Sequence, residues 1–171
     1  MSSQPKLSRI GVPFDMKPED EGVLLPWSRA SEQLNESVIY WVCTSRKDGR
    51  PLAVPVWGVW KDETFYMRMN PYTRTRTNLD ENPNVVVHLE SGEDAVIFES
   101  VAEKITDEEL RTKVAEAFDE KYDFPQPSAV FYQAKPITAM CQLCHGVGET
   151  AANEYRASGT KYRWESGEDR T

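Results

Sequence analysis

The chain has 171 residues, 39% of them hydrophobic and 28% charged, and its formal net charge is −8. This length suits one globular domain with a sizeable core, and the five tryptophans exclude wholesale disorder. An acidic chain without a block of lysine and arginine is a poor partner for nucleic acid. The sequence contains no long apolar run and no secretory signal, so we expect a cytoplasmic protein that does not span a membrane.

Proline and polar residues divide the chain into three predicted parts. Residues 1–25 contain scattered prolines and no apolar period, which predicts an extended N-terminal arm. Residues 26–145 carry the expected helices and strands of the main domain. Residues 146–171 are rich in Gly, Ser and Glu and predict a partly ordered C-terminal tail.

The first element expected after the arm is a helix, because Trp27, Ala30 and Leu34 recur at helical spacing after Pro26. The elements expected after it are strands over 38–44, 52–60 and 64–69, a short helix over 73–79, strands over 85–89 and 95–105, a helix from 106 to about 122, and a last strand from 129 to about 141.

Two local motifs are expected to set turns and helix starts. Asp48-Gly49, between the first two strands, is the usual sequence of a tight hairpin turn. Thr106 and Glu109 have the spacing of a capping box, in which the Thr106 hydroxyl accepts a hydrogen bond from the amide of Glu109.

Six short strands with few helices predict a mainly β protein, a small antiparallel barrel with flanking helices. The strand over 52–60 is apolar on both alternate faces, whereas an antiparallel strand normally shows one polar face to water. The second face must therefore be covered by a second subunit, a flat ligand or the N-terminal arm. Pro55 lacks an amide hydrogen and interrupts the ladder, so a planar heterocycle can lie on the backbone beside Trp57.

Cys141, Cys144 and His145 form the Cys-x-x-Cys-His pattern of covalent haem attachment, which normally requires an exported protein. They would also suit half of a zinc site, but Cys43 and His88 are the only other Cys and His residues. We expect no metal site and no covalent haem, and interpret Cys141 as a core residue that precedes the tail. His88 lies in an apolar strand and is interpreted as a hydrogen-bonded core residue rather than a base.

Four segments, taken in order, resemble the pyridoxamine 5′-phosphate oxidase-like split-barrel superfamily of flavin and deazaflavin binders. They are residues 41–51, 55–60, 73–79 and 82–89, and residues 162–164 resemble the aromatic C-terminal closure of the family. The resemblance covers about residues 27–140. It implies a six-stranded Greek-key split barrel that forms a homodimer, with two cofactors held across the subunit interface.

The resemblance also implies a cofactor site, for FMN or alternatively F420. The phosphate grip of the family is usually Ser-Arg-Lys, which here is Thr73-Arg74-Thr75, with Arg76 as a possible substitute for the lysine. The neighbouring apolar strand is expected to lie along the ring. The predicted cofactor-binding residues are Val54, Pro55, Val56, Trp57, Thr73, Arg74, Thr75, Arg76 and Asn78.

The resemblance leaves more than one function open. True pyridoxamine-phosphate oxidases carry basic residues where this chain has Val54 and Val59, so we expect a different substrate. The first hypothesis is an FMN- or F420-dependent oxidoreductase that transfers a hydride to or from a small organic substrate, with the cofactor carrying the chemistry and no catalytic residue assigned. The alternatives are a non-catalytic flavin, haem or bilin carrier, and a dimeric scaffold without a cofactor.

Overall fold

The computed structural model describes residues 4–10, 24–126 and 128–164. Its helices are α1 (Trp27–Glu36), α2 (Arg74–Glu81), α3 (Glu108–Tyr122) and α4 (Glu149–Ser158). Its strands are β1 (Lys6–Arg9), β2 (Ile39–Ser45), β3 (Pro51–Lys61), β4 (Thr64–Met69), β5 (Asn84–His88), β6 (Asp94–Lys104), β7 (Val130–Ala134), β8 (Thr138–Leu143) and β9 (Thr160–Arg163). Within these described ranges, no helix is long and apolar enough to cross a membrane.

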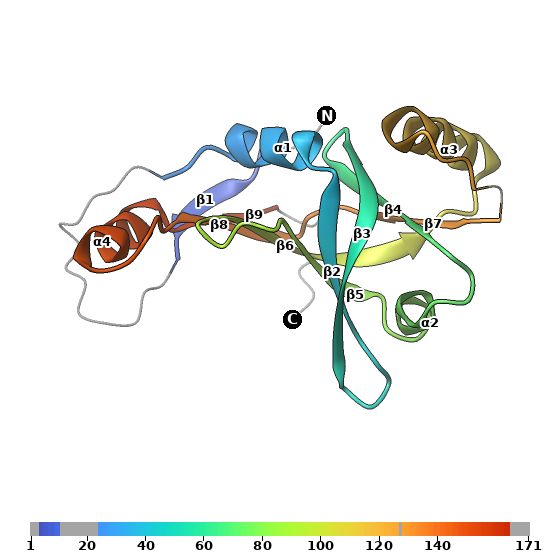
Figure 1. Cartoon of the computed structure of the whole chain (residues 1–171), viewed down its shortest axis with the longest axis horizontal. Helices are drawn as coiled ribbons and strands as arrows, with labels where there is room; N and C mark the ends of the chain where they lie inside the picture. The colour runs from blue at the N-terminus through green and yellow to red at the C-terminus, as the bar shows by residue number, and fades with distance from the viewer. Residues whose placement is uncertain (1–3, 11–23, 127, 165–171) are drawn as a thin grey trace.

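Six of the strands close an antiparallel barrel. They follow one another in the order β5-β2-β3-β4-β7-β6, and β6 pairs with β5 to complete the circle. On the edge that faces away from β5, the first part of the long strand β6 pairs with β8 and its last part pairs with β7. Strands β8, β9 and β1 extend the sheet away from the barrel toward α4 (Figure 1). The predicted mainly β fold with a six-stranded barrel is confirmed.

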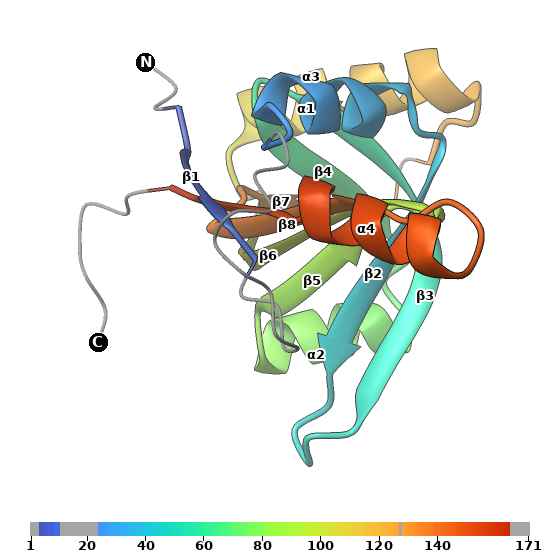
Figure 2. The ribbon, with the colours of Figure 1, turned by 90° about the vertical axis from the view of Figure 1, so that its left-hand side faces the viewer.

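The barrel interior is filled by large side chains from alternate strand positions. Tyr40 and Val42 on β2 and Phe65 and Met67 on β4 are fully buried, while the residues between those of β2 are half-buried. This period of two is what a small barrel with a packed interior requires. Helices α1 and α3 lie on one side of the barrel, and α2 lies at the opposite end beside the β2–β3 hairpin (Figure 2).

The barrel is split along β3. The first part of β3, Pro51 to Trp57, pairs with β2, but only Gly58 to Lys61 pairs with β4. Strands β3 and β4 therefore diverge on the N-terminal side of Gly58 in β3. Among the described residues, no strand pairs with the edge of β3 that faces away from β2 over Pro51 to Trp57. This is the interrupted ladder that the sequence predicted around Pro55.

The single strand predicted from 129 to about 141 is wrong, because the chain forms two strands there. Strand β7 completes the barrel with β4, and β8 leaves it to pair with β9. Between them, Pro136 has no amide hydrogen to donate, and the amide of Ile137 donates to the Glu99 carbonyl at 2.9 Å. Because of this break, β7 pairs with the part of β6 in the barrel and β8 pairs with the part of β6 in the extended sheet.

The predicted capping box is also wrong. Asp107, not Thr106, is the N-cap of α3, and its carboxylate accepts a hydrogen bond from the amide of Leu110 at 2.8 Å. Glu109 does not return a hydrogen bond to the cap, because its carboxylate pairs with Lys113 at 2.6 Å.

The C-terminal part contributes to the sheet where the sequence suggested a partly ordered tail. Strand β9 lies between β8 and β1, so the first and last of the described strands are neighbours. Tyr162 on β9 is fully buried, with its ring centroid 5.1 Å from that of Trp27. Residues 1–3 and 11–23 of the predicted arm and 165–171 of the predicted tail lie outside the described residues. The three-part division of the chain stays a prediction.

Candidate functional site

A pocket of about 550 Å³ opens where β3 and β4 diverge. Its volume lies within the range of small-molecule sites, roughly 300–1,000 Å³. The walls are the free edge of β3, the end of β4, the start of α2 and the segment after α3. The lining residues are Leu52, Val54, Pro55, Val56, Trp57, Arg68, Met69, Asn70, Thr73, Arg74, Thr75, Phe124 and Gln126.

The structure brings seven of the nine predicted cofactor-binding residues together in this pocket, all except Arg76 and Asn78. Arg76 pairs with Asp80 at 2.7 Å, and Asn78 is buried with its amide donating to the Thr44 hydroxyl at 2.9 Å. Successive helical residues are 100° apart, so Arg74 and Arg76 point to nearly opposite sides of α2. Only one of the two arginines can therefore face the pocket.

The start of α2 forms a polar end of the pocket. Thr73 is the N-cap, and its hydroxyl accepts a hydrogen bond from the amide of Arg76 at 3.3 Å. The first amides of a helix have no partner within the helix, and its dipole favours an anion there. Arg74 lines the pocket without an acidic partner among the described residues. This end of the pocket is therefore suited to a phosphate group.

The opposite end of the pocket is aromatic. Trp57 stacks on Tyr122 of α3 with ring centroids 4.6 Å apart and an angle of 6° between the planes. Phe124 meets Trp57 edge-on, with ring centroids 5.8 Å apart. Trp57 is 38% exposed and Phe124 is 54% exposed. The Tyr122 hydroxyl accepts a hydrogen bond from the amide of Gly58 at 2.9 Å, and burial raises its pKa. The end of α3 is thus held against β3 and fixes the Trp57 ring.

The two valines that replace basic residues of true pyridoxamine-phosphate oxidases lie in different surroundings. Val54 lines the pocket. Val59 is buried beneath α3 in a second hydrophobic cluster with Val114 and Phe118. Val59 is therefore part of the hydrophobic packing of α3, and Val54 makes its part of the pocket wall apolar.

Sequence reasoning missed Arg68, which lies in the wall of the pocket on β4. Its side chain is only 3% exposed, and it donates a hydrogen bond to the Phe124 carbonyl at 2.9 Å. Burial lowers the pKa of Arg68. In the sequence Arg68 is one charged residue in a weakly alternating strand, and no local pattern indicates that α3 and the following segment cover it.

The Cys-x-x-Cys-His segment lies at the end of β8 and is divided between core and surface. Cys141 is fully buried, and burial raises the pKa of its thiol to about 12. Cys144 is half-buried, and His145 is exposed with Nδ1 2.9 Å from the carboxylate of Glu154, which raises the pKa of His145. The placement of Cys141 matches its interpretation as a core residue.

The other potential ligands are dispersed. His88 is half-buried on the outward side of the barrel wall, with Nδ1 2.7 Å from the Leu89 carbonyl oxygen. It is thus hydrogen-bonded as expected but does not lie in the core. Its ring is parallel to that of Trp41, with ring centroids 6.1 Å apart. Over the described ranges, no group of three or more His, Cys, Asp and Glu residues is placed to hold a metal ion.

A comparison with models of protein families identifies the family to which this fold belongs. The family model described as pyridoxamine 5′-phosphate oxidase matches residues 27–137, which include the whole barrel and the pocket. The chain belongs to the pyridoxamine 5′-phosphate oxidase-like family. The resemblance noted from the four sequence segments is therefore confirmed.

Solved structures with the same fold differ in the cofactors that their names state. HutZ, the heme storage protein from Vibrio cholerae, is 17% identical with a TM-score of 0.54, over 64% of this chain and 87% of that one. A FAD-binding protein from Mesorhizobium loti is 17% identical with a TM-score of 0.57, over 82% and 96%. An F420 reductase is 17% identical with a TM-score of 0.52, over 64% and 94%. These identities show a shared fold alone, and a comparison with curated proteins found no match.

Proposed function

We propose that this chain binds FMN in the pocket at the split of the barrel and transfers a hydride to or from a small organic substrate. The observation that carries the proposal is the pocket itself. It joins a helix N-terminus and Arg74 at one end to a half-exposed aromatic wall at the other, along a strand edge to which no other described strand pairs. These are the groups that a phosphate and a flat heterocycle require.

The phosphate end fits a single phosphate group. The free amides at the start of α2 and the guanidinium of Arg74 form one compact cluster, beside the Thr73 hydroxyl, which donates to the Asn70 carbonyl at 3.1 Å. F420 is the alternative cofactor, but its longer acidic tail requires further positive charge. Arg50, the basic residue next to β3 on the hairpin, already pairs with Asp48 at 2.7 Å. The phosphate end therefore offers one compact cluster, which suits the single phosphate of FMN.

The ring end fits a planar heterocycle. Backbone amides and carbonyls along the free edge of β3 can pair with the polar edge of a flavin, as they would with a neighbouring strand. The half-exposed Trp57, held by Tyr122, closes the apolar end of the pocket beside that edge. When bound, the flavin supplies the hydride chemistry, and the residues of the chain bind it, orient it and exclude water.

A non-catalytic carrier of flavin, haem or bilin is the second candidate, and one observation favours it. The described residues that line the pocket include no Asp, Glu, His or Cys that could donate or accept a proton. The absorbance of the purified protein separates the cofactors, since a flavin, a deazaflavin and a haem absorb in different bands. A Soret band in place of a flavin band would contradict the FMN proposal.

The proposed phosphate site is tested by the FMN affinity of Arg74→Ala, measured by fluorescence titration. Charge-assisted hydrogen bonds are worth about 1.5–3 kcal/mol, so we expect Arg74→Ala to bind FMN roughly 10- to 100-fold more weakly than the parent protein. Arg76→Ala is the matched control, because its guanidinium pairs with Asp80 outside the pocket. We expect this control to stay within about threefold of the parent. Equal FMN affinity of Arg74→Ala and the parent would show that the site is elsewhere.

A further inference from the structure

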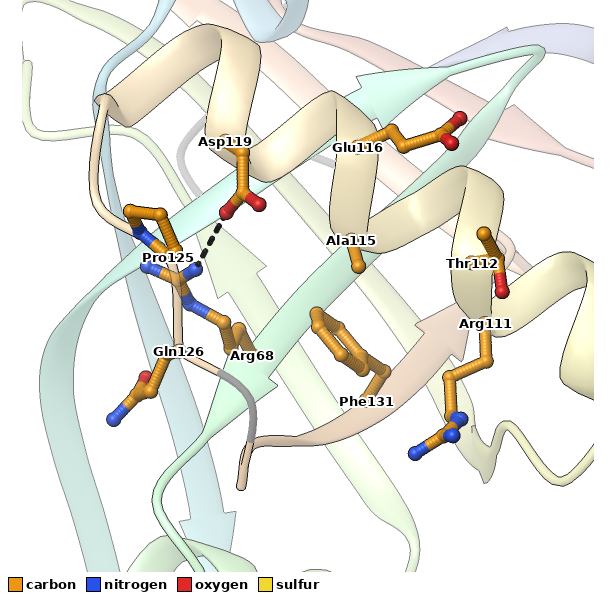
Figure 3. Close-up of a pocket in the computed structure, with 9 residues that line it drawn as sticks. All are labelled: Arg68, Arg111, Thr112, Ala115, Glu116, Asp119, Pro125, Gln126 and Phe131. Carbon is orange, nitrogen blue, oxygen red and sulfur yellow. Dashed lines mark ion pairs between the residues drawn. The ribbon is translucent and has the colours of Figure 1, made fainter.

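Arg68 is a buried cation that the phosphate end of the pocket does not use. It follows Met67, the last residue of β4 that pairs with β3, and therefore lies where the two strands begin to diverge. It lines the pocket at the split and also a second cavity of about 250 Å³ beneath α3, shown in Figure 3. The guanidinium is thus placed at the junction of two cavities.

The hydrogen-bonding capacity of Arg68 is mostly unused. A guanidinium has five N–H donors, yet among the described residues it makes one hydrogen bond, to the Phe124 carbonyl at 2.9 Å. Its acidic partner is Asp119, whose carboxylate lies 3.6 Å away and whose side chain is 44% exposed. In Figure 3 the Arg68 side chain points toward Asp119, whereas Glu116 on the same helix points away. A buried charge with so few partners favours binding of a further anion.

Aromatic rings surround the guanidinium. Its carbon lies 5.8 Å from the centroid of Trp57 and 5.0 Å from that of Phe118. The Trp57 ring and the neighbouring Phe124 ring are both partly exposed at the pocket. A ligand that places an anion on Arg68 would therefore place the adjoining group against two aromatic rings, which favours a planar ring.

We propose that Arg68 anchors the substrate by binding the carboxylate of a planar organic acid, whose ring packs against Trp57 and Phe124. This proposal rests on the proposed function, because the acid would then lie beside the flavin ring along β3. The fork of a guanidinium matches the two oxygens of a carboxylate, and the phosphate end has its own helix N-terminus and Arg74. In the protein without ligand, Asp119 is the counter-ion that the carboxylate replaces.

The test compares benzoate with its neutral counterpart benzamide by calorimetric titration of the full chain, with and without added FMN. We expect saturable binding of benzoate and at least about tenfold weaker binding of benzamide, which lacks the charge. Arg68→Gln should weaken benzoate binding about 10- to 100-fold and affect FMN affinity far less. Arg68→Lys keeps the charge but loses the two-pronged geometry, and should fall between the parent and Arg68→Gln.

Asp119→Asn tests the proposal with Arg68 in place, so the result does not depend on how Arg68→Gln folds. Removing the competing carboxylate should strengthen benzoate binding about three- to tenfold. Arg111→Gln is the control, because Arg111 lines only the second cavity and pairs with Glu108 at 2.6 Å. Its benzoate affinity should equal that of the parent.

The outcomes separate this proposal from the proposed function. Benzoate binding by the parent without FMN binding would support the anion site and contradict the flavin site. Weakened FMN binding with unchanged benzoate binding in Arg68→Gln would assign Arg68 to the cofactor and overturn the substrate role. Absence of saturable benzoate binding, equal affinity for benzamide, or weaker benzoate binding in Asp119→Asn would also overturn it.

Discussion

Gly58 is the residue at which β3 changes its partner from β2 to β4, and the surrounding packing leaves no room for a side chain. A Cβ atom there would lie 2.2 Å from Cε2 of Phe65 and 3.0 Å from Cδ2 of Tyr40. Both rings are fully buried, so neither has open space into which to move. The amide of Gly58 also donates to the Tyr122 hydroxyl that holds α3. The barrel wall, its core and the aromatic end of the pocket therefore meet at this glycine.

Gly58→Ala is expected to lower the free energy of unfolding by about 1–3 kcal/mol, the usual cost of forcing an extra methyl group into a packed core. Gly92→Ala is the matched control, since a Cβ there meets nothing within 4 Å, and its effect should stay within about 0.5 kcal/mol. Urea unfolding followed by circular dichroism measures both. If the two variants unfold at the same urea concentration, the close approach to Phe65 is not what requires the glycine.

At the scale of the element, α3 links the hydrophobic packing of the barrel to the pocket. Its inner face buries Val114 and Phe118 against the outside of the barrel, and its last residue, Tyr122, stacks on Trp57. The helix begins one residue after Thr106, the cap that the sequence predicted. Thr and Asp both cap helices well, so the local sequence allowed either start. In the structure the Asp107 carboxylate accepts the hydrogen bond from the amide of Leu110, which makes Asp107 the cap.

Asp107→Ala is expected to lower the free energy of unfolding by about 0.5–2 kcal/mol, because the amide of Leu110 loses its acceptor. Thr106→Ala removes a hydroxyl that makes no capping bond and should change stability by less than about 0.5 kcal/mol. Urea unfolding of the two variants gives the comparison. A larger loss in Thr106→Ala than in Asp107→Ala would place the cap at the residue that the sequence predicted.

At the scale of the whole molecule, one outward face of the barrel wall carries a row of mainly apolar side chains. Trp41 pairs across the strands with Pro55 on one side and His88 on the other, and the row continues through Ile97 to Met140. All five side chains are half-buried or exposed. Together with the open split of β3, this row is the surface that we propose a second copy of the chain covers, with the cofactor at the interface.

The parent protein is therefore expected to sediment as a dimer at micromolar concentration. Ile97→Glu would place an unpaired charge in the middle of the interface and should raise the dimer dissociation constant at least about 100-fold. Val147→Glu is the control, because Val147 is apolar and 93% exposed but lies outside the row. A parent that sediments only as a folded monomer, or a dimer unaffected by Ile97→Glu, would contradict this interface.

The sequence by itself determined the features that depend on neighbours along the chain. Runs of β-branched, aromatic and other apolar residues predicted β2, β3 and β4 close to their observed bounds, and Asp48-Gly49 predicted a turn in which Gly49 has φ of +84°. The sequence also indicated two walls of the pocket, because both faces of β3 are apolar and the start of α2 is polar. These features follow from side-chain period and backbone preference, which act over a few residues.

Only the tertiary structure decided which side chains meet in the pocket. Arg74 faces it and Arg76 does not, because the packing of α2 sets how the helix is rotated. Arg68 becomes a buried cation because α3 and the segment around Phe124 fold over β4. Strand β1 joins the sheet through its pairing with β9, more than 150 residues away in the chain. Such contacts depend on where distant elements pack, and no local pattern of residues specifies them.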